Sequence, residues 1–333
     1  MSERMKVVVT DFIEEPFDVE RKILGDLADV VGLGAMGEAS LDERIDEADA
    51  IMLYHFITLS ESTLKRLKRC KLIVRCGVGF DNVDHALAAR LGIPVANVPD
   101  YGTEEVADSA IGMMLALTRG IHALNSRLQL GHGEWSYTQV TPIQRLRGRV
   151  FGIVGVGRIG GATALRARAL GMDVVFYDPY APDGRDKSMG IRRVDSLEEL
   201  LRESDVVSMH CPSTSETTGM INDEAIALMK PGSFLINTAR GVVVEPSAVL
   251  RGIETERLRG AALDVLPIEP PPAQDPLMKA WRDPEHLAHH RVIINPHAAF
   301  YSEEGLMDMR IKGSQNCRRA LIGEPLRNIV NRP

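Results

Sequence analysis

The sequence predicts an α/β fold in which parallel strands are joined by helical crossovers and two such sheets follow one another. Short apolar runs rich in valine and isoleucine alternate with helical segments along most of the chain. This order is typical of a parallel sheet covered by helices on both faces. The chain has 333 residues, which is enough for about two domains.

The first hundred residues carry the first set of alternating segments. Strands are expected at 6–10, 29–31, 50–54, 72–75 and 95–97, and helices at 18–27, 41–48, 62–68 and 84–91. Ser40 and Glu43 have the spacing of a capping box before the second of these helices, and Gly92 is placed to end the fourth. These segments predict one parallel sheet before residue 100.

The most informative stretch is 150–178. Residues 150–154 and 172–177 predict two buried strands, and residues 159–170 between them have helical periodicity. Gly155, Gly157 and Gly160 stand at the turn into this helix. In that spacing the first glycine allows a tight turn, the second lets a pyrophosphate approach the backbone, and the third permits close packing of helix and strand. The N–H groups of the helix then face the phosphates, so the stretch predicts a dinucleotide site.

Asp178 follows the second of these strands and completes the pattern. A carboxylate at this position accepts hydrogen bonds from the ribose hydroxyls and repels a 2′-phosphate. The expected cofactor is therefore NAD in preference to NADP.

Two further glycine clusters lie in the first hundred residues. Gly32, Gly34 and Gly37 repeat the same spacing, but Glu38 stands where a phosphate would lie and no acid follows the next strand, so a loop is expected. Gly77 and Gly79 follow the strand at 72–75. They either expose backbone N–H groups to an anion or form an ordinary turn with Asn82 as the cap of the next helix.

A long helical run, 103–119, begins the second half, and a second helical segment spans 121–130. Residues 111–117 are apolar almost all round, which predicts burial between domains or subunits. Residues 131–149 are polar and loop-like, with Trp135 as the expected anchor. Further strands are expected at 205–209, 234–237, 261–263 and 292–294, and helices are expected after the caps Ser196, Asn222 and Ser302.

Three polar residues follow the ends of the later strands: Arg240, Glu269 and His297. In a doubly wound sheet these ends converge on the bound cofactor. The planar arginine fork matches a carboxylate. A histidine, with an ordinary pKa of about 6.5, can donate and recover a proton near neutrality, and a glutamate can orient its ring. We therefore expect an acid–base pair and a carboxylate anchor for a 2-oxo acid.

Structural roles are the alternative for each of these residues: a surface ion pair for Arg240, a solvated loop acid for Glu269 and a cap for His297. The joint occurrence behind a dinucleotide motif favours catalysis. Asp264 is expected to hold the nicotinamide carboxamide. His286 and His290 stand four residues apart, but no nearby carboxylate or cysteine completes a site, so no metal is expected.

Charge and composition exclude several classes of protein. The net charge of −7 argues against nucleic-acid binding, and Arg145, Arg147 and Arg149 are interpreted as a solvated turn. No apolar run has the ~20 residues needed to cross a bilayer, and Met1 runs directly into the first strand, so no membrane and no signal peptide are expected. Four cysteines without metal or disulfide spacing indicate reduced thiols and a cytoplasmic protein.

Taken in order, these motifs resemble those of the D-isomer-specific 2-hydroxyacid dehydrogenases over essentially the whole chain. The matching pieces are Gly77-Val-Gly79 with Asp81-Asn82, Gly155 to Gly160, Asp178, Asn237 to Gly241, Ala262 to Val265, Glu269-Pro270 and Pro296-His297. The resemblance implies two Rossmann-like domains, a flavodoxin-like substrate domain and a doubly wound NAD domain. It also implies a homodimer formed through the helices after Thr103.

Within this family, segments 52–59, 80–82, 177–180 and 296–302 are similar to the C-terminal-binding-protein branch of transcriptional corepressors. Phe300 stands where that branch has an active-site tryptophan, so selectivity for a bulky thioether keto acid is not expected. Val78 and Val106 replace hydroxyl residues of the corepressors, and their long C-terminal extension is absent. A metabolic dehydrogenase is therefore expected.

The resemblance also assigns site residues. Arg240, Glu269 and His297 are the expected catalytic residues. The substrate carboxylate is expected at the backbone of Val78 and Gly79. The expected substrate-binding set is Arg75, Gly77, Val78, Gly79 and Phe300. The expected NAD-binding set is Gly155, Gly157, Arg158, Ile159, Gly160, Asp178, Cys211, Pro212, Thr217, Thr238, Ala239, Arg240, Asp264 and His297.

The expected domains are a substrate domain, 1–99 plus 299–333, and an NAD-binding domain with the dimerisation helices, 100–298. The expected reaction interconverts a small 2-oxo acid, such as glyoxylate or hydroxypyruvate, and its D-2-hydroxy acid. Two alternatives stay open. One is D-3-phosphoglycerate oxidation, although no basic phosphate-binding cluster shows near Gly77. The other is an NAD-gated corepressor that binds peptides near Tyr54 and His55.

Overall fold

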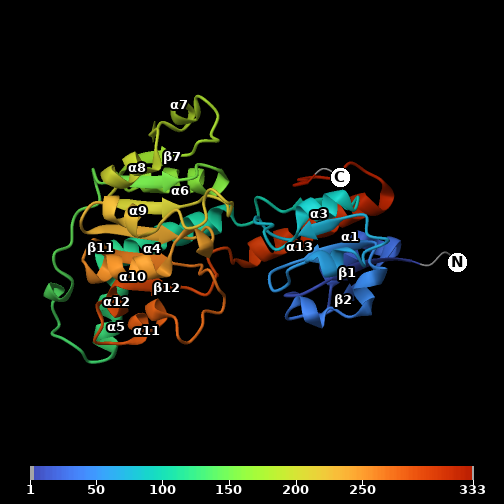
Figure 1. Cartoon of the computed structure of the whole chain (residues 1–333), viewed down its shortest axis with the longest axis horizontal. Coiled ribbons are helices and arrows are strands. Elements are labelled where there is room, and N and C mark those ends of the chain that lie inside the picture. The colour runs from blue at the N-terminus through green and yellow to red at the C-terminus, as the bar shows by residue number, and fades with distance from the viewer. Residues whose placement is uncertain (1–3, 332–333) are drawn as a thin grey trace. The chain divides into compact units, whose positions relative to one another are not determined.

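The computed structural model describes residues 4–331 and divides into two units, each with its own sheet (Figure 1). Unit 1 runs to Gly102 and resumes at Ser302, and unit 2 is Thr103–Tyr301. These divisions lie three residues after the domain boundaries expected at 99/100 and 298/299. The two-sheet α/β fold class is confirmed.

Unit 1 has a five-stranded parallel sheet in the order β2-β1-β3-β4-β5, which is the flavodoxin-like order. Its strands are β1 (Met5–Val9), β2 (Ala28–Gly32), β3 (Ala50–Leu53), β4 (Ile73–Arg75) and β5 (Val95–Asn97). All five were expected, with ends shifted by at most a few residues. Every residue of β3 and β4 is buried, as in strands covered on both faces.

The helices of unit 1 cover both faces of this sheet. They are α1 (Asp18–Leu24), α2 (Glu61–Leu64), α3 (His85–Arg90) and α13 (Glu303–Ile322). The terminal helix α13 packs against α1, β3 and β4, and Figure 1 shows it in red beside the blue α1. Arg310 of α13 donates two hydrogen bonds, of 2.8 and 2.7 Å, to the fully buried carboxylate of Glu20 in α1. Removing either partner would leave a buried charge uncompensated, so this pair holds the returning helix in place.

In unit 1 one local prediction is wrong, and one alternative role that the sequence left open for Asn82 is excluded. Residues 41–48 form no α-helix: one short 3₁₀ turn, Glu38–Ser40, precedes them, and a second, Glu43–Glu47, lies within them. The capping box fails because the Ser40 hydroxyl donates to the carbonyl of Gly37, and Asp42 caps the second turn instead. Asn82 does not cap α3, because Asp84 accepts the N–H of Leu87 while the Asn82 amide donates to Ile57.

Unit 2 has a seven-stranded parallel sheet in the order β12-β11-β10-β9-β6-β7-β8. Its strands are β6 (Val150–Val154), β7 (Asp173–Tyr177), β8 (Arg192–Arg193), β9 (Val206–Met209), β10 (Ser233–Asn237), β11 (Leu258–Leu263) and β12 (Val292–Ile294). The order reverses between β6 and β9, the switch point of a doubly wound sheet. The two-arginine strand β8 carries no apolar pattern and was not expected.

Helices cover both faces of the unit 2 sheet. They are α4 (Thr103–Arg119), α5 (Ile121–Gln129), α6 (Arg158–Ala169), α7 (Arg185–Met189), α8 (Leu197–Glu203), α9 (Asp223–Leu228), α10 (Pro246–Glu254), α11 (Pro276–Arg282) and α12 (Leu287–Arg291). Residues of α4 and α6 share one core cluster, and residues of α8 to α12 share the other. Ser196, Asn222 and Ser302 cap their helices as expected. Residues of the sheet alternate between the two clusters, as the pleat requires.

Two expectations concern the segment around α4 and α5, and one of them is wrong. Within 111–117, Met113, Met114 and Leu117 are buried and Gly112 is exposed, so one side of the apolar run is covered within the chain and burial between subunits stays a prediction. Trp135 is 91% exposed, so it is not the expected anchor among residues 4–331. Its neighbour Tyr137 begins a 3₁₀ turn, Tyr137–Val140, and is also exposed.

All four cysteines are free and buried, as expected. Burial raises the pKa of Cys70 and of Cys76 to about 12, so both remain thiols at neutral pH. Across residues 4–331, no helix combines the length and the apolar character that crossing a bilayer requires.

Candidate active site

The glycine turn after β6 has the close backbone packing that its spacing predicts. Gly155 has φ +91°, and a Cβ there would lie 2.9 Å from the backbone of His210 and Cys211. A Cβ on Gly160 would lie 2.1 Å from the carbonyl oxygen of Gly155. A side chain at Gly157 would meet no atom within 4 Å, so the turn is open on that side. Gly155 and Gly160 are therefore required by packing, and Gly157 leaves an open approach to the backbone.

The amino end of α6 opens onto this approach. Gly157 is its N-cap and supplies no side-chain acceptor to the first N–H groups of the helix. Arg158 is exposed and Ile159 is half-buried at the first two helical positions. An uncapped helix terminus behind a glycine turn presents N–H donors and a positive dipole end to an anion. This cradle fits a pyrophosphate.

Asp178 is tied to the same turn. Its Oδ2 accepts the N–H of Val156 at 2.9 Å, and its Oδ1 accepts the N–H of Tyr180 at 2.9 Å. Gly155 in turn donates its N–H to the carbonyl of Tyr177. The carboxylate is therefore held beside the glycine turn, and each oxygen keeps a lone pair for a ribose hydroxyl.

The loop after β9 packs beside the glycine turn and begins His210-Cys211-Pro212. Burial raises the pKa of Cys211 to about 11, so this residue is a neutral thiol and not a nucleophile. The hydroxyl of Thr217 donates to the carbonyl of Pro212 at 2.6 Å and accepts the N–H of Thr214 at 2.8 Å. Thr217 thus shapes the loop through its own hydrogen bonds.

The loop after β10 holds Arg240. The buried Asn237 side chain donates to the carbonyl of Arg240 and accepts the N–H of Ala239, which fixes the turn. A Cβ on Gly241 would lie 1.9 Å from the backbone of Leu266, so this turn packs directly on the loop after β11. The Arg240 guanidinium donates to the carbonyl of Ala239 at 2.8 Å and is half-buried.

Thr238 adds an observation that points to a ligand. The residue is 8% exposed, and its hydroxyl has no hydrogen-bond partner among residues 4–331. A buried hydroxyl without a partner costs about 1–3 kcal/mol. Because Thr238 follows β10 at the carboxyl end of the sheet, a cofactor bound there would supply the missing partner.

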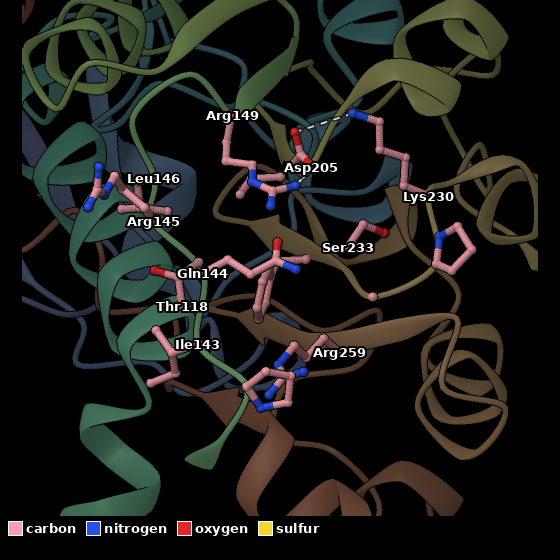
Figure 2. Close-up of a pocket in the computed structure, with 15 residues that line it drawn as sticks. Thr118, Ile143, Gln144, Arg145, Leu146, Arg149, Asp205, Lys230, Ser233 and Arg259 are labelled. Atoms are coloured by element: carbon pink, nitrogen blue, oxygen red, sulfur yellow. Dashed lines mark hydrogen bonds and ion pairs between the residues drawn. The ribbon is translucent and has the colours of Figure 1, made fainter. Parts of the chain in front are cut away.

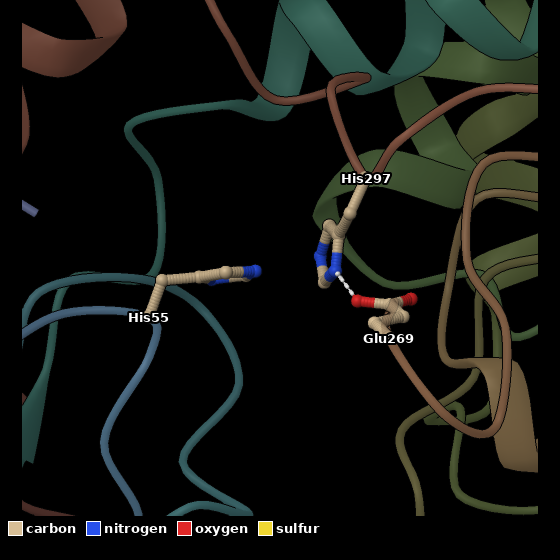
Figure 3. Close-up of side chains that lie close together, drawn as sticks. All are labelled: His55, Glu269 and His297. Carbon is tan, nitrogen blue, oxygen red and sulfur yellow. Dashed lines mark hydrogen bonds and ion pairs between the residues drawn. The ribbon is translucent and has the colours of Figure 1, made fainter. Parts of the chain in front are cut away.

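Glu269 and His297 are brought together from two loops, as Figure 3 shows. Nδ1 of His297 lies 2.7 Å from Oε2 of Glu269, and Oε1 of Glu269 accepts the N–H of Leu266 at 2.8 Å. The side chains are 22% and 33% exposed, so both are reachable from solvent. Because Glu269 engages Nδ1, proton exchange by His297 would use Nε2.

Asp264 positions the histidine through the backbone, a role the sequence did not indicate. Its Oδ1 accepts the N–H of Ala298 at 2.9 Å and that of Ala299 at 3.1 Å, and its carbonyl accepts the N–H of His297 at 2.7 Å. His297 is held at φ +54°, a conformation that non-glycine residues rarely adopt. Burial raises the pKa of Asp264, against the effect of these N–H donors. Asp264 was expected to hold the nicotinamide carboxamide, but its carboxylate already accepts the N–H groups of Ala298 and Ala299.

Phe300 lies near the histidine within unit 2. The two ring centroids are 6.2 Å apart with an interplanar angle of 80°, an edge-on contact. Phe300 therefore helps to shape the surroundings of the imidazole.

In unit 1, the Gly77 loop is built over Arg75. The Arg75 guanidinium fills the space where a Gly77 Cβ would stand, with Nη1 at 1.4 Å from that position, and Arg75 is 8% exposed. Gly77 donates its N–H to the carbonyl of Arg75, whereas no residue of 4–331 accepts the N–H of Val78 or Gly79. Together with the capping of α3 by Asp84, this favours the anion-binding interpretation of the loop.

Another buried carboxylate supports a loop of unit 1, and the sequence did not predict it. The fully buried carboxylate of Asp11 accepts the N–H groups of Tyr54, His55 and Phe56 at 3.0, 2.6 and 2.5 Å. It therefore fixes the loop after β3. A lone aspartate after a strand carries no distinct sequence signal for such a role.

Two patterns were not expected to form sites: the Gly32–Gly37 glycine spacing and the pair His286 and His290. Residues of both have structural roles. The carboxylate of Glu38, in the Gly32–Gly37 loop region, accepts the N–H and hydroxyl of Ser60. His286 caps α12 by accepting the N–H of Ala288, and its Nε2 lies 3.3 Å from Glu254.

Comparisons with known proteins agree with this geometry. Residues 111–299 match the family described as D-isomer specific 2-hydroxyacid dehydrogenase, NAD binding domain. The chain is 33% identical over 329 residues to D-3-phosphoglycerate dehydrogenase of Methanocaldococcus jannaschii, covering 99% of this chain and 60% of the relative. It is 34% identical over 313 residues to C-terminal-binding protein 1 of Caenorhabditis elegans, covering 92% of this chain and 42% of that protein. The chain thus spans about half the length of these curated relatives.

Among solved structures, the D-lactate dehydrogenase of Aquifex aeolicus, complexed with NAD and lactic acid, is similar over nearly its whole length. The TM-score is 0.86 at 30% identity, and the match covers 98% of this chain and 99% of that one.

Proposed function

Because the chain belongs to the D-isomer-specific 2-hydroxyacid dehydrogenase family and contains its NAD-binding domain, we propose that it interconverts a small 2-oxo acid and the D-2-hydroxy acid. The observation that carries this proposal is the hydrogen-bonded pair Glu269–His297 in the unit that also holds the glycine turn. The four buried, free thiols suit a reducing compartment, so the proposal includes a cytoplasmic enzyme.

The acid–base role falls to His297. Glu269 accepts a hydrogen bond from the Nδ1–H group of His297, which sets the tautomer and orients the ring. In the reductive direction, Nε2 of His297 donates its proton to the carbonyl oxygen as that oxygen becomes a hydroxyl. In the oxidative direction, the same nitrogen takes the proton back, so one residue serves both directions.

Arg240 and the Gly77 loop are the proposed binding groups for the substrate. The guanidinium of Arg240 stays charged at neutral pH and offers a planar fork to a carboxylate. The N–H groups of Val78 and Gly79 are the proposed donors to the substrate carboxylate, in the manner of a backbone nest. Arg75 acts below this loop by supporting Gly77.

The proposed NAD-binding residues are those of the glycine turn and α6 for the pyrophosphate, Asp178 for the ribose, and the loops after β9, β10 and β11 for the nicotinamide end. When bound as NADH, the cofactor supplies the hydride that reduces the substrate carbon. The protein's part is to hold the nicotinamide and the proton donor in fixed positions relative to the carbonyl.

Glyoxylate and hydroxypyruvate are the first proposed substrates. We place phosphoglycerate oxidation second, because its substrate carries a phosphate that needs a cation. Arg75 lies in the Gly77 loop, but its guanidinium is buried beneath Gly77 and supports the loop. The test is NADH oxidation by the purified chain with glyoxylate, hydroxypyruvate, pyruvate and phosphohydroxypyruvate. We expect saturable turnover with at least one of the first three, and turnover with none of the four would overturn the proposal.

The corepressor alternative rests on the likeness to C-terminal-binding protein 1. A peptide groove lined by Tyr54 gains no support, because Tyr54 is 1% exposed and packs in the core of unit 1. A peptide pull-down alongside the turnover panel separates the two functions. Partner capture without turnover would favour the corepressor.

The choice of cofactor gives a second prediction. For Asp178→Ser, we expect the ratio of kcat/KM with NADPH to that with NADH to rise by about tenfold or more. The substitution removes both the ribose acceptor and the charge that repels a 2′-phosphate. Steady-state kinetics with each cofactor measure this ratio. Asp173→Ser, at the exposed start of β7, is the matched control and should leave it unchanged.

A homodimer is also proposed. Large apolar residues are exposed along α5 and the turn that follows it: Ile121, Leu128, Leu130, Trp135 and Tyr137. Such a concentration of exposed apolar side chains is typical of a subunit interface.

For the double variant Trp135→Ser, Tyr137→Ser, we expect a shift from dimer to monomer in size-exclusion chromatography with light scattering. Leu165→Ser, which changes an exposed leucine of α6, is the control and should remain dimeric. A wild-type chain that is monomeric at micromolar concentration would contradict the proposal.

A further inference from the structure

A cavity of about 530 Å³ lies within unit 2, away from every residue proposed for catalysis. Figure 2 shows its lining, which includes Asp205, Ser233 and Arg259. These residues stand at or beside the starts of β9, β10 and β11, which are neighbours in the sheet. The glycine turn and Arg240 follow the opposite ends of strands in this parallel sheet. The cavity therefore lies at the amino edge of the sheet, and the dehydrogenase machinery lies at the carboxyl edge.

The lining of this cavity has an excess of positive charge. Arg149 and Lys230 share the carboxylate of Asp205, at 3.2 and 3.3 Å, and Figure 2 shows them on either side of it. Arg145 and Arg259 also line the cavity, and neither forms a close ion pair among residues 4–331, although Glu256 acts on Arg259 from a longer distance. Four cations and one acid thus line the cavity.

Arg259 is held in an unfavourable setting for a cation. Its guanidinium makes one long hydrogen bond, of 3.4 Å, to the carbonyl of Val140. Burial and the neighbouring Arg291 lower its pKa. An anion bound beside Arg259 would relieve both effects.

Ser233 supplies an independent sign of a ligand. The residue is 2% exposed, lines the cavity, and its Oγ has no hydrogen-bond partner among residues 4–331. Buried hydroxyls normally have a partner, because leaving one unsatisfied is unfavourable. A ligand oxygen in the cavity would provide it.

Part of the remaining wall of the cavity is apolar. Ile143, Leu146 and Phe234 contribute side chains to the lining. A volume of this size is in the range of small-molecule sites, roughly 300–1,000 Å³. The cavity therefore offers cations and a hydroxyl to an anionic head, and an apolar surface to an organic body.

We propose that this cavity binds a small phosphate monoester with an apolar organic group. The phosphate, which carries up to about two negative charges at neutral pH, lies among Arg145, Arg259 and the Ser233 hydroxyl. The organic group lies against Ile143, Leu146 and Phe234. This site is separate from the proposed dehydrogenase site and does not depend on it.

The test is calorimetric titration of the full chain, saturated with NAD so that its pyrophosphate site is filled. The probes are phenyl phosphate, inorganic phosphate and phenol. We expect phenyl phosphate to bind most tightly, inorganic phosphate more weakly because it lacks the apolar group, and phenol not at all. Binding of phenyl phosphate should weaken as salt is raised. Failure of phenyl phosphate to bind at millimolar concentration would overturn the proposal.

Substitutions of the lining residues test whether phenyl phosphate binds in this cavity. Arg145→Gln changes an exposed side chain, and Arg259→Gln changes a half-buried one. Each variant should bind phenyl phosphate about tenfold more weakly, because each loses one charge-assisted hydrogen bond. Ser233→Ala should weaken it by a smaller factor. Arg282→Gln, an exposed arginine of α11, is the control and should bind like wild type. Unchanged affinity in both Arg145→Gln and Arg259→Gln would place the anion elsewhere and overturn the proposal. NADH turnover should be unaffected in all four variants.

Discussion

Replacing His297 with asparagine is expected to lower kcat by about 10²–10⁴-fold, the contribution typical of a general acid–base residue. Asparagine keeps a polar side chain of similar reach but cannot donate and recover a proton. The hydrogen bond from Nδ1 to Glu269 is also lost. Stopped-flow and steady-state NADH oxidation with the best 2-oxo acid measure the change.

The control for this variant is His286→Asn. His286 also belongs to unit 2, but its Nδ1 caps α12 and its Nε2 faces Glu254, so turnover should stay within about twofold of wild type. Thermal denaturation of both variants checks that each is folded. A folded His297→Asn enzyme with undiminished kcat would remove His297 from the mechanism.

The second large effect is expected from Arg240→Gln. Loss of a charge-assisted, bidentate contact costs about 1.5–3 kcal/mol, so kcat/KM for the 2-oxo acid should fall by about 10–150-fold. The fall should be seen largely as a higher KM if Arg240 binds the carboxylate equally in the ground and transition states. A fall confined to kcat would instead assign Arg240 to the reacting carbonyl.

Arg240→Lys separates charge from geometry at this position. A lysine restores the positive charge but not the planar fork, so it should recover only part of the activity lost in Arg240→Gln. Full recovery would indicate that charge alone is needed. Wild-type kcat/KM in Arg240→Gln would contradict the proposed role.

Much of the fold was predictable because it depends on short-range pattern. Strand Val150–Val154 and helix Thr103–Arg119 lie at the predicted residues. Both have strong apolar periodicity and clear local ends. The helix expected at 41–48 failed because its capping signal was weak: the Ser40 hydroxyl turned to the carbonyl of Gly37, and Asp42 started a 3₁₀ turn. Local hydrogen bonds of short polar side chains compete with helix formation in this way.

For the candidate site, residue types and their order after strands indicated Arg240, Glu269 and His297. Strand ends of a parallel sheet meet at one edge, so this inference needed no distances. The sequence pattern did not indicate which buried side chains hold the loops of these residues in place. Asp264 holds the His297 loop, Asn237 holds the Arg240 turn, and Asp11 holds the loop after β3. A buried aspartate or asparagine looks the same in sequence whether it serves a ligand or the backbone.

The sequence by itself determined the parallel sheets, the glycine turn and the family, because each depends on spacing along the chain. The tertiary structure alone decided which polar groups meet, since those contacts join residues far apart in sequence. It joined Glu269 to His297, left Trp135 exposed on the surface, and gathered Arg145, Ser233 and Arg259 around one cavity. These outcomes follow from packing and from the need to satisfy buried polar groups, which act only once the chain has folded.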